Sequence, residues 1–227
     1  MYGGATAIFL DGTVIADRID IQGGWYTNAE LGINSGTTLQ TQNSTVVRAR
    51  GTLYGGGTVD GDLINAGTVS CDYGHVTYPN ITGNYSMNDH PISEIDDSGT
   101  IWYLLEPIDH DSSNSYDAID VDGVANLGGL LYLSGGGDVP EVAGQSITIL
   151  NATGGINGDF DSIWSNGFSE DIVPLVSIVD NGDGSESVVV EIQSVSSLVG
   201  FGNPNETDID SLPNDAETAD IDGDGYV

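Results

Sequence analysis

Short apolar segments alternate with glycine-rich turns along most of the chain. In residues 51–70 a glycine, a threonine and an apolar residue recur three times, at Gly51-Thr52-Leu53, Gly57-Thr58-Val59 and Gly67-Thr68-Val69. Glycine permits tight turns, and a threonine followed by an apolar residue suits a half-buried strand. The apolar segments are too short for helices, so the pattern predicts a chain that winds through short strands.

The same rhythm divides the rest of the chain. Residues 1–115 read as coils of short strands, with an irregular spacing on the order of 17 to 25 residues per coil. Residues 116–197 read as the last coils and an antiparallel cap, because two apolar runs flank the turn at 181–184. Residues 198–227 read as an irregular acidic tail.

Charge excludes several classes of partner. The chain has 35 acidic residues against 3 basic ones, a formal net charge of −32, and its only basic side chains are Arg18, Arg48 and Arg50. Nucleic-acid binding and docking on anionic lipid need clustered basic residues. No apolar run is long enough to insert into a membrane. The field favours cations, so we expect a protein that works in salt or with bound calcium.

Several phrases resemble one known family. These are the repeated Gly-Thr-Leu and Gly-Thr-Val units and the stretches 61–69, 116–129 and 143–150. Together, residues 51–195 resemble the C-terminal end of the parallel β-helix in bacterial autotransporter passengers. The resemblance implies an all-β fold, a right-handed parallel β-helix (solenoid) closed by C-terminal antiparallel strands. It also implies an extracellular or cell-surface location and a role without catalysis.

The last residues resemble the start of a calcium loop of the EF-hand or dockerin type. Carboxylates stand at loop positions 1, 3 and 5, a glycine at position 6 and a backbone carbonyl ligand at position 7: Asp220, Asp222, Asp224, Gly225 and Tyr226. The acid expected at position 12 lies beyond Val227. We therefore expect the start of a module that binds calcium in a longer protein; the alternative is an acidic, irregular end.

Other carboxylates offer weaker sites. Asp180, Asp183 and Glu186 could bind calcium, but a glycine-rich turn explains them better. Paired carboxylates for polysaccharide cleavage would be Asp60 with Asp62, which share a face if the strand is continuous, or Asp96 with Asp97. A lyase also needs a basic residue beside the substrate, and three arginines supply this chemistry poorly. We therefore expect no enzyme.

The remaining candidates each have a structural explanation. Cys71 alone forms no disulfide framework and is expected to be buried. Three histidines lack the spacing of a zinc site, and three tryptophans could stack on sugars or form ladders between coils. Five sequons matter only if the source glycosylates them. The histidines are His75, His90 and His110, and the tryptophans are Trp25, Trp102 and Trp164. The sequons begin at Asn43, Asn80, Asn84, Asn151 and Asn205.

The leading interpretation is a non-enzymatic extracellular structural or surface protein. Its β-helix would be a spacer or a self-assembling unit, forming a homo-oligomer or polymer such as a fibre or layer, with an acidic surface bridged by calcium. The alternative is a carbohydrate-binding adhesin module with a glycan partner. A further alternative is a polysaccharide-degrading β-helix enzyme.

Overall fold

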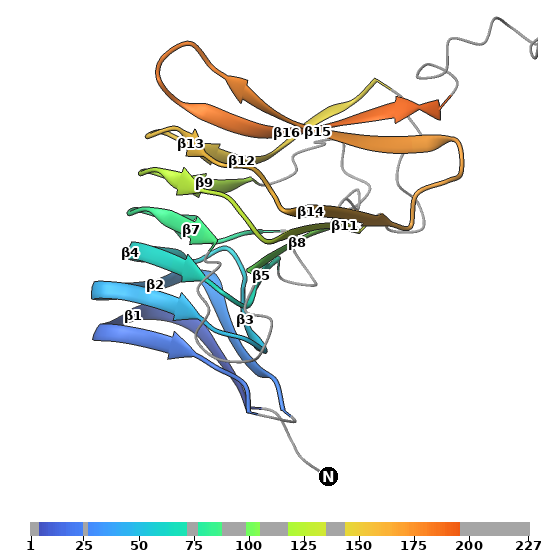
Figure 1. The fold of residues 1–227 in the computed structure, drawn as a ribbon. Coiled ribbons are helices and arrows are strands. Elements are labelled where there is room, and N and C mark those ends of the chain that lie inside the picture. Colours follow the sequence, from blue (N-terminus) through green and yellow to red (C-terminus); the bar gives the residue numbers. More distant parts are fainter. Residues whose placement is uncertain are drawn as a thin grey trace, which may run out of the picture.

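The computed structural model describes residues 5–24, 27–71, 77–87, 99–104, 118–134 and 144–195. This part of the chain is all-β: its strands join in one 16-stranded sheet in which most neighbours are parallel. Figure 1 shows them stacked from β1 at one end to the β15–β16 hairpin at the other. The all-β prediction is therefore confirmed, while the predicted acidic tail lies outside the described residues.

The parallel strands form three rows, each hydrogen-bonded from one level of the stack to the next. β1 (Ala5–Ile21) and β2 (Ala29–Val47) are long enough to contribute to every row. Row 1 continues with β3 (Gly51–Tyr54), β5 (Thr68–Ser70), β8 (Thr100–Leu104), β11 (Leu130–Ser134) and β14 (Ser162–Asn166). Row 2 continues with β4 (Thr58–Asn65), β6 (Asn80–Ile81), β9 (Ile119–Val121) and β12 (Ser146–Ala152). Row 3 uses the end of β4, then β7 (Tyr85–Met87), β10 (Ala125–Asn126) and β13 (Ile156–Asn157).

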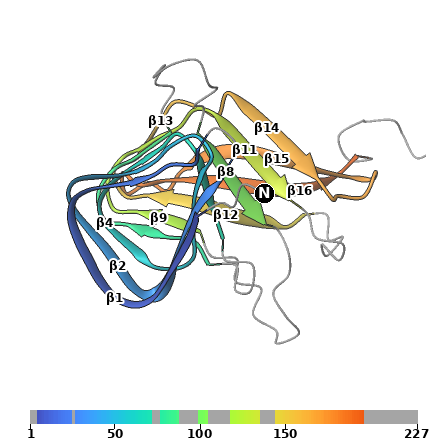
Figure 2. The same cartoon turned by 90° about the horizontal axis from the view of Figure 1, so that it is seen from below.

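The rows meet at corners where the backbone bends. The β1–β2 register shifts between Phe9 and Asp11 and again between Ala16 and Arg18. Gly12 stands at the first corner with a φ of 103°, a conformation that glycine adopts without steric cost. Viewed from below, β1 and β2 curve around the interior that the rows enclose (Figure 2). The chain therefore turns this corner within one continuous strand, β1.

Direction reverses at the C-terminal end. β16 (Glu186–Ser194) pairs antiparallel with β12 and with β15 (Ile172–Asp180). The turn between them contains Gly182 and Gly184, both at positive φ. The sequence prediction of an antiparallel hairpin here is confirmed.

The core consists of columns of aliphatic side chains from successive levels. In row 1 the register aligns one such column, and its members are at most 8% exposed: Leu31, Leu53, Val69, Ile101 and Leu131. Each level covers the one before it, which is how a stack of short strands obtains a continuous core. Cys71 is buried in the same core, as predicted.

One polar side chain is part of this core. Asn65 is fully buried and donates from Nδ2 to Tyr85 Oη at 2.9 Å and to the Thr100 carbonyl at 3.0 Å. Its Oδ1 accepts from the Gly67 N–H at 3.1 Å. Burial raises the pKa of Tyr85 far above its ordinary value, so the phenol stays neutral and hydrogen-bonded. Asn65 thus ties three levels together at a corner between row 3 and row 1.

Levels differ in the length of chain that they use. The chain runs from Thr52 to Thr68 between paired positions at one level, and from Thr68 to Thr100 at the next. The spacing is therefore irregular, as expected, but the step from Thr68 to Thr100 exceeds the expected range, because insertions between strands leave the paired register intact. In the described residues no helix is long and apolar enough to cross a membrane.

Candidate functional site: a polar groove on row 2

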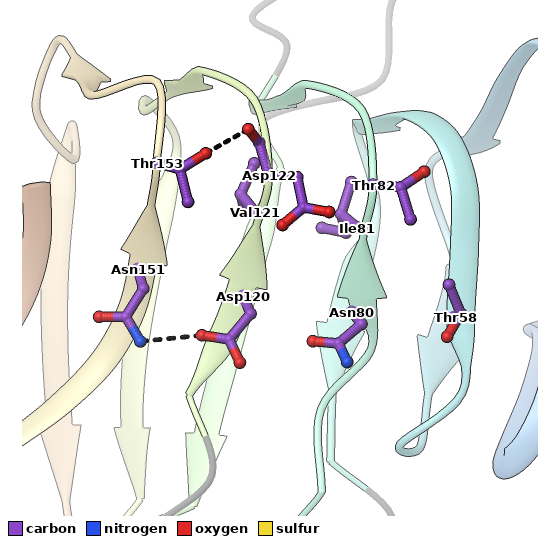
Figure 3. Close-up of a pocket in the computed structure, with 9 residues that line it drawn as sticks. All are labelled: Thr58, Asn80, Ile81, Thr82, Asp120, Val121, Asp122, Asn151 and Thr153. Atoms are coloured by element: carbon purple, nitrogen blue, oxygen red, sulfur yellow. Dashed lines mark hydrogen bonds between the residues drawn. The ribbon is translucent and has the colours of Figure 1, made fainter. Parts of the chain in front are cut away.

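Polar side chains line a groove on the outer surface of row 2. The register sets Thr58 beside Asn80 and Asp120 beside Asn151, while Ile81 and Val121 pair between them. The groove has a volume of about 430 Å³, opens to solvent and is drawn in Figure 3. Its lining is Thr58, Asn80, Ile81, Thr82, Asp120, Val121, Asp122, Asn151 and Thr153.

Strand geometry explains this lining. Successive side chains of a strand point to opposite faces, so an apolar residue between two polar ones turns inward and the polar ones turn outward. Ile81 and Val121 are buried, with 1% exposed each, whereas Asp120 and Asp122 are exposed. The triplets Asn80-Ile81-Thr82, Asp120-Val121-Asp122 and Asn151-Ala152-Thr153 therefore repeat one pattern at three levels.

Many polar groups of the groove bind their neighbours in the stack. Asn151 Nδ2 donates to Asp120 Oδ1 at 2.8 Å, and Ser187 Oγ donates to Asn151 Oδ1 at 2.8 Å. Thr153 Oγ1 donates to the Asp122 carbonyl, as Figure 3 shows. These ladders join β9, β12 and β16 from the outside, so the groove stabilises the stack as well as facing solvent.

The structure separates the carboxylates of Asp60 and Asp62. Asp60 accepts from Gln40 Nε2 at 2.8 Å and from Thr82 Oγ1 at 3.0 Å. Asp62 instead accepts from the N–H and side-chain amide of Asn84, at 2.8 and 3.2 Å. β4 bends at Gly61, whose φ is 130°, so Asp60 belongs to row 2 and Asp62 to row 3. The prediction that they share a face assumed a continuous strand and is wrong.

The hairpin-loop carboxylates also have structural partners. Asp180 Oδ1 accepts from the Gly182 N–H at 2.7 Å, and Asp183 Oδ1 from the N–H and Oγ of Ser185 at 2.9 and 2.6 Å. The Ser185 hydrogen bonds lower the pKa of Asp183. Glu186 Oε2 accepts from the Ile156 N–H at 2.5 Å. The turn interpretation therefore accounts for Asp180 and Asp183, whereas Glu186, in β16, binds the backbone of β13.

The basic side chains gather at the first two levels. Arg18 and Arg48 both bind Asp20, with N–O distances of 2.9 and 2.8 Å. Burial raises the pKa of the Asp20 carboxyl, but the hydrogen bonds and charges of Arg48 and Arg18 outweigh burial and hold it below its usual range. Arg50 donates to the Gly24 carbonyl at 3.1 Å. Arg18 lies on β1, and Arg48 and Arg50 lie just beyond the end of β2, away from the strands that line the groove.

Several predicted residues lie outside the part of the chain that the structure describes. They include the calcium-loop residues Asp220, Asp222, Asp224 and Tyr226, which therefore remain a prediction. The same holds for Asp96, Asp97, His75, His90, His110, Trp25 and Asn205. Among the described residues, no group of three or more His, Cys, Asp or Glu side chains could hold a metal ion.

The register aligns three aromatic residues along row 1. Trp102 pairs with Tyr132, and Tyr132 with Trp164. Trp164 is 62% exposed, and Tyr132 Oη accepts from Asn166 Nδ2 at 3.4 Å. Sequence reasoning selected the two tryptophans but missed the tyrosine between them, because only the register shows that it lies in their column.

The groove was likewise missed at the sequence level. Asn80, Asn84 and Asn151 were noted only as sequons. Asn80 and Asn151 line the groove, and Asn84 and Asn151 form hydrogen bonds with neighbouring levels of the stack. The repeated triplet of two polar residues around one apolar residue was the available signal.

No family model, curated protein or solved structure matches this chain, so its fold and groove are interpreted from its own residues.

Proposed function

We propose that this chain is a non-enzymatic extracellular structural or surface protein. Its coils form a right-handed parallel β-helix that acts as a stiff spacer or a self-assembling unit. The observation that carries the proposal is the use of polar groups on the outer face: they bind one another from level to level, as Asn151 does with Asp120 and Ser187. Such ladders support a scaffold more directly than a catalyst.

The β-helix is supported by the three parallel rows. β1 and β2 pass through all of them, and later levels return to each row in the same order. A parallel connection between neighbouring strands is right-handed in nearly all proteins. Row 1 stacks seven strands, and strands lie about 4.8 Å apart, so the spacer is about 30 Å long.

A role without catalysis is supported by the separation of the candidate carboxylates and bases. Asp60 and Asp62 belong to different rows. Arg18 and Arg48 are engaged with Asp20. The groove therefore has carboxylates but no adjacent arginine to bind an acidic sugar or move a proton.

Calcium and location follow from the charge. A chain with a net charge of −32 repels itself unless cations neutralise it. We infer that divalent cations bridge the acidic surface, and that Asp220, Asp222, Asp224 and Tyr226 are ligands of a calcium loop. Calcium is abundant outside cells, which fits an extracellular or cell-surface protein.

Two measurements test this function. Small-angle X-ray scattering should show a rigid particle whose profile fits the stacked strands, and sedimentation velocity should show larger species in calcium than in chelator. The profile of a flexible chain would contradict the spacer, and release of reducing or unsaturated sugar from polysaccharides would replace it with an enzyme.

The carbohydrate-binding adhesin is the second candidate, favoured by the exposed Trp164 in register with Tyr132. Aromatic faces exposed to solvent stack on sugar rings. Binding on a glycan array that Trp164→Ala abolishes, and that an Asn43→Ala control leaves intact, would favour this function.

A further inference from the structure

The two ends of the stack differ. At the N-terminal end β1 pairs with β2 along one edge, and no described strand pairs with its other edge. Its apolar side chains are open to solvent: Ile8, Phe9, Leu10 and Ile15 are 38–71% exposed. An unpaired edge with exposed apolar residues is a template for another strand.

The C-terminal end is less accessible to a second stack. β16 continues row 2 beyond β12, and β15 extends the same row by one more strand, whereas row 1 ends at β14. Row 2 therefore projects beyond row 1. Pro174 in β15 also lacks a donor for pairing. A copy approaching this end meets one projecting strand instead of three level edges.

The charge distribution also favours docking at the N-terminal end. Residues 5–54 hold all three arginines against four acidic residues, whereas residues 144–195 hold eight acidic residues and no base. At the first two levels the only charged residue of row 1 is Glu30, while row 3 holds Arg18 and Arg48 with Asp20. Row 1 is therefore acidic and row 3 is basic overall.

We propose that β1 is the docking edge for β1 of a second copy, in an antiparallel, two-fold pair. The inference rests on the proposed stacked scaffold and names its partner. A two-fold axis through the middle of β1 sets row 1 of each copy over row 3 of the other. Glu30 of one copy then approaches Arg18 and Arg48 of the other, so the two paired N-terminal ends are complementary in charge.

One register satisfies the side chains. If Val14 faces its own equivalent, Phe9 lies opposite Ile19 and Ala7 opposite Ile21. These positions pair with Leu39, Ile33, Thr45, Leu31 and Val47 of β2, which are buried, so they all face inward. The core columns would therefore continue across the interface.

The same register satisfies the backbone. The Ala5 N–H donates to the Asn28 carbonyl, and the Ile21 carbonyl accepts from the Arg48 N–H, so these residues face β2. Alternate residues face opposite ways, so Ile8 and Asp20 direct their N–H and C=O groups to the free edge. The register sets Ile8 opposite Asp20, which forms a hydrogen-bonded pair.

A cost at the corners makes the pairing depend on salt. Asp11 lies near Asp17 of the second copy in this register. Screening weakens repulsion between exposed carboxylates. Each copy carries a net charge of −32, so repulsion between the copies exceeds the local attraction of Glu30 for the arginines, and the dimer should be tighter at high salt than at low salt, with no requirement for calcium.

Sedimentation velocity on the whole chain tests the pairing with two matched proline variants. Ile8→Pro removes a donor from the free edge of β1. Ile163→Pro does the same for β14, because the Ser162 N–H donates to Gly129 and Ile163 therefore faces away. We expect a dimer for the unmodified chain and for Ile163→Pro, and at least about tenfold weaker association for Ile8→Pro. Weakening by Ile163→Pro, or a concentration-independent monomer, overturns the proposal.

A cross-link tests the register. In a Cys71→Ala background, Val14→Cys would meet its own equivalent at the two-fold axis, where directly opposed Cα atoms lie about 4.5–5.5 Å apart, a separation that permits a disulfide. Mild oxidation should give covalent dimers of Val14→Cys and monomers of Ile178→Cys at the opposite end. The reverse result, or no cross-link at Val14, refutes the register.

Two controls separate the possible failures. Ile15→Glu adds a carboxylate two residues from Asp17 at a 71% exposed position, so it should increase the repulsion and weaken the dimer without unfolding the chain, as circular dichroism would show. A monomer that keeps the rigid scattering profile refutes the pair and leaves the spacer. A monomer with the Ile8 amide protected from hydrogen exchange would mean that the chain's own residues cover β1, which also overturns the proposal.

Discussion

Replacing Asn65 by alanine should destabilise the stack more than replacing any exposed asparagine. The side chain is fully buried and makes three hydrogen bonds, two from Nδ2 and one to Oδ1. Asn65→Ala leaves the Gly67 N–H, the Thr100 carbonyl and the Tyr85 hydroxyl without this partner. A buried polar group left unsatisfied costs about 1–3 kcal/mol. We therefore expect the free energy of unfolding to fall by about 3–5 kcal/mol.

The control is Asn126→Ala on the outer face. Asn126 donates to Ser86 Oγ at 3.2 Å and accepts from Asn157 Nδ2 at 3.0 Å, but water can replace these partners. Its loss should cost under about 1 kcal/mol. Urea unfolding followed by far-UV circular dichroism measures both variants. Equal costs for the two asparagines would refute the argument that burial sets the size of the effect.

A double-mutant cycle localises the effect. Tyr85→Phe removes the hydroxyl that accepts from Asn65 Nδ2. If the two groups act through this bond, the double variant should cost about 1 kcal/mol less than the sum of the single variants. Strict additivity would mean that Asn65 acts mainly through the backbone groups of Gly67 and Thr100.

Three other predictions concern packing and charge. Gly67→Ala should be strongly destabilising, because its Cβ would lie 2.2 Å from the Arg48 carbonyl oxygen. Gly128→Ala is the control, because the atom nearest to its Cβ would be 3.4 Å away; thermal melting compares the two variants. Leu53→Ala should cost about 2–5 kcal/mol, because its side chain is fully buried, and urea unfolding measures the loss. Asp20 has a lowered pKa, so its contribution is present above the unfolded-state pKa near 3.8 and is lost as the pH falls through the folded-state value. Unfolding measured at several pH values tests this. Because the pair with Arg48 is exposed, Asp20→Asn should reduce the fall in the free energy of unfolding between neutral and acid pH by under about 1 kcal/mol.

Local pattern predicted the strands but not their neighbours. The alternation of Gly, Thr and apolar residues predicted strands around Leu53, Val59 and Val69, and these positions are buried in the core. The hairpin was also predictable, because its turn residues are local. The three rows depend on pairing between residues such as Thr68 and Thr100, and chain segments of unequal length hide that pairing from any fixed period.

The site shows the same limit. Asp60 and Asp62 looked paired because they stand two residues apart, but a single bend at Gly61 separates them. Asp120 and Asn151 looked unrelated because 31 residues separate them, yet they share a hydrogen bond. Sequence identifies which residues can turn outward, whereas the register decides which of them meet.

Row geometry also determines how the molecule responds to force. Hydrogen bonds between levels run along the stack, from β1 at one end to β15 at the other (Figure 1). A pull applied between the two ends therefore loads these bonds in the direction that opens them one after another, as in a zipper, instead of shearing them together. Because each level contacts mainly its neighbours, tension should peel the molecule level by level. Each step would release a length of slack set by that level, short between Thr52 and Thr68 and long between Thr68 and Thr100.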